Sequence, residues 1–196
     1  MTPQHPVTRL TIHEFLPVHI AAAVAMLSKG QWSGAGPLGQ PIGAWQSTVG
    51  QLNRLFILHD DASMDADPHA TNGGDIQPTA RFVHWLRAVK PTVLPAPTAM
   101  LYELRFYTLF SGCLPRYVPL LLDALPARER YSQNVGIWTS QSGSVDQLVH
   151  LWAYTDANER TNLRPSIDAD PAWQRFVPQI LPMIQSIQNY FLMRVL

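Results

Sequence analysis

The sequence has a single cysteine, no net charge and no apolar run long enough to span a bilayer. Cys113 is the one cysteine, so no disulfide can form within the chain, which suits a reducing compartment. Fourteen basic and fourteen acidic residues cancel, and charge therefore gives no reason to expect nucleic acid or an anionic membrane as a partner. The apolar segment Leu16–Leu27 contains His19 and is too short for a membrane span. We expect a cytoplasmic protein that binds neither nucleic acid nor membrane.

Motifs for several reactions are absent or lack their structural context. No G-x-S-x-G is present, so serine hydrolysis has no support. Gly34–Gly39 matches G-x-G-x-x-G, but a dinucleotide site needs a strand before the glycines and a helix after them, and here the order is a helix and then a hairpin. His13, His59 and His150 come from three separate predicted strands without the tight spacing of metal ligands. The sequence therefore predicts no metal and no cofactor.

A β-hairpin pattern occurs twice in the chain. In Tyr131–Arg160, β-branched and aromatic residues follow a period of two on both sides of a Gly143-Ser144 turn, which is typical of a hairpin. Pro41–Asp61 repeats this pattern. Three residues of the first hairpin recur 93 positions later (136 − 43), namely Gly43, Trp45 and Gly50 as Gly136, Trp138 and Gly143. We infer two diverged copies of one unit, covering residues 1–97 and 98–196.

Helix and strand patterns around the hairpins complete each copy. The first copy is predicted to contain a strand at Arg9–Phe15, a helix from Val18 to Leu27 ended by Lys29-Gly30, the hairpin, an exposed loop at Asp60–Thr79, a helix at Arg81–Val89 and a linker at Lys90–Pro97. The second copy is predicted to begin with a strand at Tyr102–Leu109 and a helix whose apolar stripe is Tyr117, Leu120, Leu121 and Ala124. The hairpin follows, and then a helix from Ala157 to about Ile167 that is capped by Asp156. A further helix after Asp170-Pro171 runs to Ile184, and a strand at Phe191–Leu196 ends the copy.

Each copy thus has the order β-α-β-β-α-β of the ferredoxin-like unit. Such a unit forms a four-stranded antiparallel sheet with its helices on one face. Two copies can pack sheet to sheet and close a barrel within one chain. The predicted fold class is α+β, with tandem ferredoxin-like units that form one intramolecular dimeric α+β barrel, and we expect a monomeric pseudo-dimer or an oligomer of pseudo-dimers.

Several motifs of the second copy resemble the NIPSNAP family. They are Tyr102-Glu103-Leu104-Arg105-Phe106-Tyr107-Thr108-Leu109, Gly136-Ile137-Trp138, His150-Leu151-Trp152-Ala153-Tyr154 and Asp170-Pro171-Ala172-Trp173. The resemblance covers about Tyr102–Leu196 and implies a dimeric α+β barrel. The first copy departs from it, with Thr11-Ile12-His13 in place of E-x-R and Ile57-Leu58-His59 in place of H-x-W. The resemblance implies a fold more firmly than a reaction.

The candidate site lies on two strands of the second copy. Alternation places three residues on one face of each strand, namely Glu103, Arg105 and Tyr107, and His150, Trp152 and Tyr154. The opposite faces are apolar and suit the helices, so we expect these six side chains to line the barrel interior. Trp138 completes the candidate ligand-binding set, although a tryptophan there also suits the core.

Three functions are compatible with this set. The polar residues can bind a small, partly aromatic or acidic molecule, with Arg105 and His150 as anchors. The related barrels include cofactor-free and haem-linked oxygenases and isomerases, which is an analogy of fold. A structural or partner-binding protein would instead fill the barrel with its own paired side chains.

Overall fold

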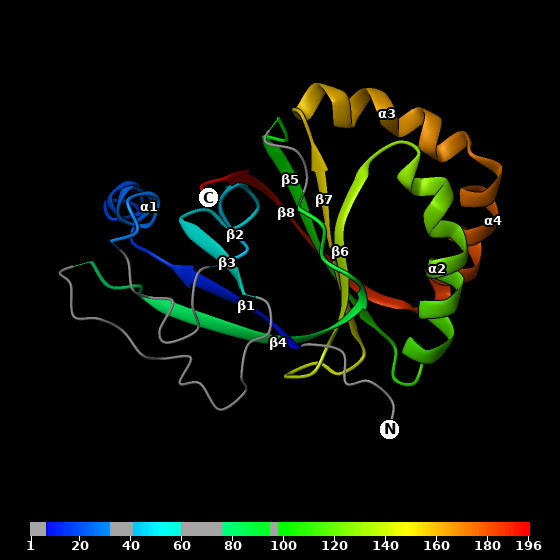
Figure 1. Ribbon diagram of the computed structural model, residues 1–196. Coiled ribbons are helices and arrows are strands. Elements are labelled where there is room, and N and C mark those ends of the chain that lie inside the picture. Colours follow the sequence, from blue (N-terminus) through cyan, green and yellow to red (C-terminus); the bar gives the residue numbers. More distant parts are fainter. Residues whose placement is uncertain (1–6, 32–40, 60–75, 95–97) are drawn as a thin grey trace. The chain divides into compact units, whose positions relative to one another are not determined.

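The computed structural model describes residues 7–31, 41–59, 76–94 and 98–196 (Figure 1). The glycine motif at 34–39 and most of the loop predicted at 60–79 lie outside these residues. The described strands follow the order β1-β3-β2-β8-β5-β7-β6-β4 and close a barrel. The predicted α+β barrel is therefore confirmed.

The chain forms two compact units. The boundary between them is not a single point in the sequence, because it falls within β4 and within β8 and leaves the tip of the second hairpin in the first unit. The first unit takes residues 1–88, 141–143 and 190–196, and the second takes 89–140 and 144–189. In chain order the elements of the first half are β1 (Val7–Glu14), α1 (Ile20–Ser28), β2 (Gly43–Val49), β3 (Arg54–His59) and β4 (Ala80–Lys90). Those of the second half are β5 (Leu101–Leu109), α2 (Leu114–Glu129), β6 (Gln133–Ser140), β7 (Gln147–Tyr154), α3 (Ala157–Ala169), α4 (Pro171–Ile180), the 3-10 turn η2 (Leu181–Met183) and β8 (Ile184–Arg194).

In the first unit, β1 lies between two antiparallel partners, β3 and β4. Helix α1 buries Ile20, Ala23 and Leu27 against Leu55 and Ile57 of β3. This stripe has the helical spacing that the sequence indicates, and the helix ends at Ser28, with Gly30 at a φ of 64°. The helix predicted from Val18 is confirmed.

The helix predicted at Arg81–Val89 is wrong, because this segment is strand β4. It pairs with β1 over the full length of β1, from Val7 opposite Arg87 to Glu14 opposite Ala80. The apolar residues of this stretch fit a helical period and an extended one about equally well, and ladder hydrogen bonds to β1 select the extended form.

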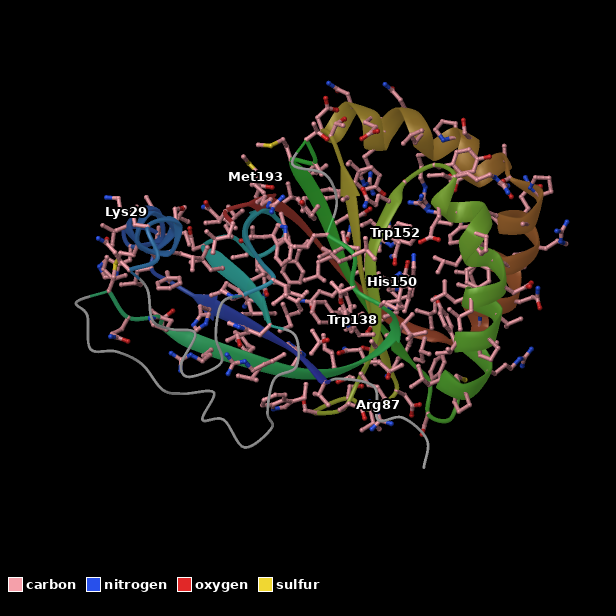
Figure 2. All side chains as sticks on the ribbon, viewed as in Figure 1. Lys29, Arg87, Trp138, His150, Trp152 and Met193 are labelled. Atoms are coloured by element: carbon pink, nitrogen blue, oxygen red, sulfur yellow. The ribbon has the colours of Figure 1, made fainter. Side chains whose placement is uncertain are left out.

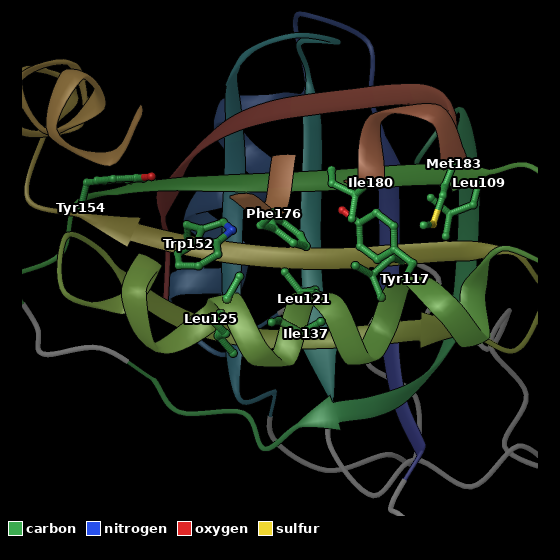
Figure 3. Close-up of a cluster of buried hydrophobic side chains, with 12 residues drawn as sticks. Leu109, Tyr117, Leu121, Leu125, Ile137, Trp152, Tyr154, Phe176, Ile180 and Met183 are labelled. Atoms are coloured by element: carbon green, nitrogen blue, oxygen red, sulfur yellow. The ribbon is translucent and has the colours of Figure 1, made fainter. Parts of the chain in front are cut away.

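In the second unit, α2 and α4 cover one face of the sheet formed by β5, β7 and β6 (Figure 1). Figure 3 shows α2 running along the strands, with Tyr117, Leu121 and Leu125 turned toward them. Phe176 and Ile180 of α4 complete the same buried cluster. Helix α4 ends at Ile180 rather than at Ile184, where β8 begins.

The recurrent glycine and tryptophan of the two hairpins have a packing role. A Cβ atom added to Gly136 would overlap the ring of Trp138, and one added to Gly43 would overlap the ring of Trp45. Each indole therefore lies against the glycine two residues earlier, on the same face of its strand. Both tryptophans are almost fully buried, so the repeat reflects the same packing in each hairpin.

Candidate functional site

The six polar and aromatic residues of β5 and β7 share one face of the sheet. The strands are antiparallel, with Arg105 opposite His150 and Glu103 opposite Trp152. Because directly opposed residues in a ladder project to the same side, the predicted grouping is confirmed.

The side on which this face lies differs from the prediction. The Tyr107 ring lies 6.5 Å from the Tyr117 ring of α2, edge to face, and the guanidinium of Arg128 in α2 lies 4.4 Å from the centre of the Trp152 ring. The candidate face therefore packs against the helices and does not line the barrel interior. The prediction assumed that the purely apolar face meets the helices, whereas here the helices supply partners for the polar one.

Trp138 does not join this group. It lies opposite Val149, whereas its neighbour Ile137 lies opposite His150 and belongs to the cluster under the helices. Since successive residues of a strand project to opposite faces, Trp138 is on the other side of the sheet. Figure 2 shows His150 and Trp152 along β7.

Glu103 is the buried centre of an ion cluster. Its Oε1 accepts hydrogen bonds from Arg105 Nη2 at 2.8 Å, Arg160 Nη2 at 2.7 Å and Asn189 Nδ2 at 2.9 Å. Burial alone would raise the pKa of Glu103, but the hydrogen bond from Arg160 and the charge of Arg105 outweigh it and hold the pKa at about 2. Glu103 is therefore ionised at every physiological pH.

Helix α2 contributes a third arginine that sequence reasoning missed. Arg128 donates to the hydroxyl groups of Ser132 and Tyr154, and it is 4% exposed. It continues the buried stripe of α2 after Tyr117 and Leu121. An arginine at a position where the helical spacing predicts a buried apolar residue was the sequence feature that could have identified it. Arg105, Arg128 and Arg160 against Glu103 leave an excess of two positive charges in this part of the unit.

His150 is buried and uncharged. Burial first, and then the positive charge of Arg105, lower its pKa to about 3. Its Nδ1 accepts from Trp152 Nε1 at 3.5 Å, and its ring lies 4.6 Å from the Tyr107 ring. Within the part of the chain that the structure describes, its Nε2 has no hydrogen-bond partner, and neither has Nε of Arg105.

A cavity of about 180 Å³ lies between this face of the sheet and the helices. Arg105, Tyr107, His150 and Trp152 form its sheet side. Its helix side is mainly apolar and aromatic, with Tyr117, Leu121, Trp173, Phe176 and Ile180. The sequence identified the polar wall, whereas the aromatic wall was predicted only as core.

The corresponding face of the first unit has different residues. Arg9 and Thr11 of β1 lie opposite His59 and Ile57 of β3. Since Ile57 and His150 occupy equivalent hairpin positions, Thr11 corresponds to Arg105, and not His13 as the prediction had it. The two units therefore differ at both proposed anchors.

Among the described residues, no group of three or more histidine, cysteine or acidic side chains could hold a metal ion. None of the described helices combines the length and hydropathy needed to cross a membrane.

Comparison with known proteins places the second unit in a family. The NIPSNAP family model matches residues 102–195. A NIPSNAP domain protein from Burkholderia xenovorans of known structure is 33% identical over 47% of this chain and 91% of its own, with a TM-score of 0.45. The chain belongs to the NIPSNAP family. The predicted resemblance is thereby confirmed.

More distant similarity extends over the whole chain. A monooxygenase-like protein from Lactobacillus acidophilus superposes on 98% of this chain with a TM-score of 0.71 at 10% identity, which shows the fold alone. Among NIPSNAP relatives, the mouse protein NipSnap homolog 2 is 29% identical over 96 residues. These residues cover 49% of this chain and 34% of the mouse protein, so the chain spans about a third of that relative's length.

Proposed function

We propose that this NIPSNAP protein binds a small aromatic anion in the cavity of its second unit. The observation that carries the proposal is a pair of buried nitrogens, Arg105 Nε and His150 Nε2, which belong to two residues that line the cavity and have no partner among the described residues. A buried donor without an acceptor costs about 1–3 kcal/mol. A ligand oxygen that accepts from both would remove this cost.

Charge favours an anion at this position. Three arginines face one carboxylate, and Glu103 is already saturated by Arg105, Arg160 and Asn189. An internal ion network accounts for Glu103, but it leaves the positive excess uncompensated. An acidic ligand would compensate part of it.

The volume and lining favour a single aromatic ring. A cavity of about 180 Å³ is smaller than the roughly 300–1,000 Å³ of drug-sized pockets and close to the about 150 Å³ that accommodates benzene. Tyr107, Trp152 and Phe176 offer ring faces and edges for stacking. A ligand such as a benzoate or a phenolate combines this size with an acidic oxygen.

The first test is native mass spectrometry of freshly purified protein, which reveals any retained small molecule. Isothermal titration with benzoate and with uncharged benzamide then compares an acid with a neutral analogue of nearly the same size. We expect benzoate to bind more tightly. Equal binding of the two would contradict an anion site, and binding of neither would favour a cavity filled by water or by a rearranged side chain.

Two variants locate the site. Arg105→Met and His150→Phe should each weaken benzoate binding by roughly 1–3 kcal/mol, because each removes one hydrogen bond to the anion. Arg175→Met is the matched control, since Arg175 is exposed on α4 and does not line the cavity. Wild-type affinity in both cavity variants, with folding intact, would move the site elsewhere.

Other parts of the function remain predictions. Location in the cytoplasm is supported only by the lone cysteine, Cys113. The oxygenase or isomerase alternative is supported only by likeness of fold. A structural or partner-binding role would leave the cavity of the purified protein without a bound ligand.

A further inference from the structure

The tautomer of His150 follows from its contact with Trp152. An indole Nε1 is always a donor, so the nitrogen that it contacts, Nδ1 of His150, must carry the lone pair. In a neutral imidazole the hydrogen then lies on Nε2. In His150, a residue that lines the cavity, Nε2 is therefore an N–H donor and not a basic nitrogen.

Arg105 offers a second donor beside it. The two residues are directly opposite in the ladder between β5 and β7, where side chains begin about 5 Å apart. Two nitrogens of the Arg105 guanidinium already donate hydrogen bonds, Nη1 to the Tyr107 hydroxyl at 3.1 Å and Nη2 to Glu103. The remaining Nε–H is the one without a partner in the described residues.

We propose that the cavity binds its aromatic ligand through a deprotonated oxygen and selects a phenolate over the corresponding phenol. This inference rests on the proposed function and adds the protonation state of the ligand. A phenolate oxygen can accept from both Arg105 Nε and His150 Nε2. A neutral phenol brings a hydrogen of its own, and no described residue that lines the cavity carries a carboxylate to accept it.

The charged and titratable groups around the cavity also favour a bound anion over a neutral ligand. Strands β5 and β7 present Glu103, Arg105, Tyr107, His150 and Tyr154; helices α2 and α3 present Tyr117, Arg128, Arg160 and the ion pair Arg164–Asp168. Glu103 is the one carboxylate among them outside the Arg164–Asp168 pair, and its Oε1 accepts from two arginines. The remaining positive charge stabilises an anion and lowers the pKa of a bound phenol.

The test uses 4-nitrophenol, whose anion absorbs visible light and whose neutral form does not. Its absorbance is titrated against pH, free in solution and with the protein in excess. We expect the anion to bind at least about tenfold more tightly than the neutral phenol. This difference lowers the midpoint of the pH titration of the bound ligand by about one pH unit or more, relative to the free ligand. A midpoint that is unchanged or raised while the ligand stays bound would overturn the inference and leave the proposed function intact.

The cavity variants separate this inference from the proposed function. In Arg105→Met and His150→Phe the midpoint should move back toward that of free 4-nitrophenol, whereas Arg175→Met should keep the wild-type shift. Binding of benzoate without binding of 4-nitrophenol would overturn the inference alone. Binding of neither ligand would overturn both.

Nitrogen-15 NMR of the imidazole rings supplies a test that needs no ligand and no stable variant. His150 should show a protonated Nε2 and an unprotonated Nδ1 at neutral pH, and it should stay uncharged down to about pH 4. The seven histidines of the chain are distinguished by the loss of one signal in His150→Phe, or by sequential assignment if that variant does not fold. A hydrogen on Nδ1 would overturn the inference.

Discussion

At the scale of single residues, Glu103 shows how a buried charge is made stable. Its side chain is fully buried, and its carboxylate accepts from Arg105 and Arg160 of the same unit. Taking one partner away from such a group leaves the other charges uncompensated, which costs more than the pair itself contributes. This asymmetry sets two expectations for its replacement.

Glu103→Gln should lower the free energy of unfolding at pH 7 by on the order of 3 kcal/mol, because Arg105 and Arg160 lose their shared carboxylate. Glu129→Gln is the matched control. Glu129 pairs with Lys90 at a partly exposed position, where such a pair contributes about 0–1 kcal/mol. Urea unfolding of both variants measures the difference, and equal losses would contradict a central role for Glu103.

The same residue predicts a dependence on pH. The pKa of Glu103 is about 2 in the folded protein, below its ordinary value of 4.5. The stabilisation is therefore fully present above pH 4.5 and is lost as the pH falls toward 2, by roughly 3 kcal/mol in total. The difference in unfolding free energy between wild type and Glu103→Gln should shrink over this range, and a constant difference would show that the carboxylate does not titrate there.

Gly136 is a second residue with a defined role, because Trp138 covers it. Gly136→Ala should destabilise the protein by about 1–3 kcal/mol, since a Cβ atom forces the indole out of place. Trp138→Phe should partly relieve this strain, so the double variant should lose less than the sum of the single ones. Strictly additive losses, measured by thermal or urea unfolding, would contradict the packing of the ring over the glycine.

At the scale of elements, the two helix caps of the second unit differ in what they support. Asp156 accepts from Glu159 N at 2.8 Å, and Thr155 N donates to the Glu159 carboxylate, as the sequence predicted for α3. Asp170 accepts from Ala172 N at 2.9 Å through one oxygen and from Tyr131 and Arg130 through the other. It therefore caps α4 and also ties this helix to the end of α2.

Asp156→Ala should cost about 1 kcal/mol, the usual loss of an N-cap. Asp170→Ala should lower the melting temperature more than Asp156→Ala does, because it also removes the contacts to Arg130 and Tyr131. It should also weaken ligand binding, since α4 carries Trp173, Phe176 and Ile180 of the cavity wall. Asp170→Asn, which keeps a cap acceptor, should lie between wild type and Asp170→Ala, and an effect as small as that of Asp156→Ala would contradict this reasoning.

At the scale of the whole molecule, the barrel closes within one chain. All of its strands, in the order β1-β3-β2-β8-β5-β7-β6-β4, come from the described residues of one chain. We therefore expect that closure requires no second subunit, unlike in barrels that form by dimerisation.

We accordingly expect a monomer of 22.0 kDa, or an oligomer in which each copy keeps its own barrel. Light scattering coupled to size-exclusion chromatography measures the mass. A dimer that dissociates only on unfolding would indicate strands shared between copies. The division into copies at 1–97 and 98–196 stays a prediction.

Local sequence patterns were enough to show which residues share a face of a strand. Alternation grouped Glu103, Arg105 and Tyr107, and the motif of glycine and tryptophan in both hairpins identified the duplicated pattern. These features are local, because the period of a strand and the room needed by an indole depend on a few neighbouring residues. The NIPSNAP motifs then led to the family and the barrel.

Tertiary structure decided which face meets the helices and which segments become strands. Alternation relates residues to one another but does not say which of two buried faces the helices cover. Arg128 and Arg160 lie far from β5 in the sequence, and they supply the partners that let the polar face pack against the helices. Likewise, β4 is a strand because β1 pairs along its length. In both cases the deciding contacts join residues far apart in the chain, so no local pattern could contain them.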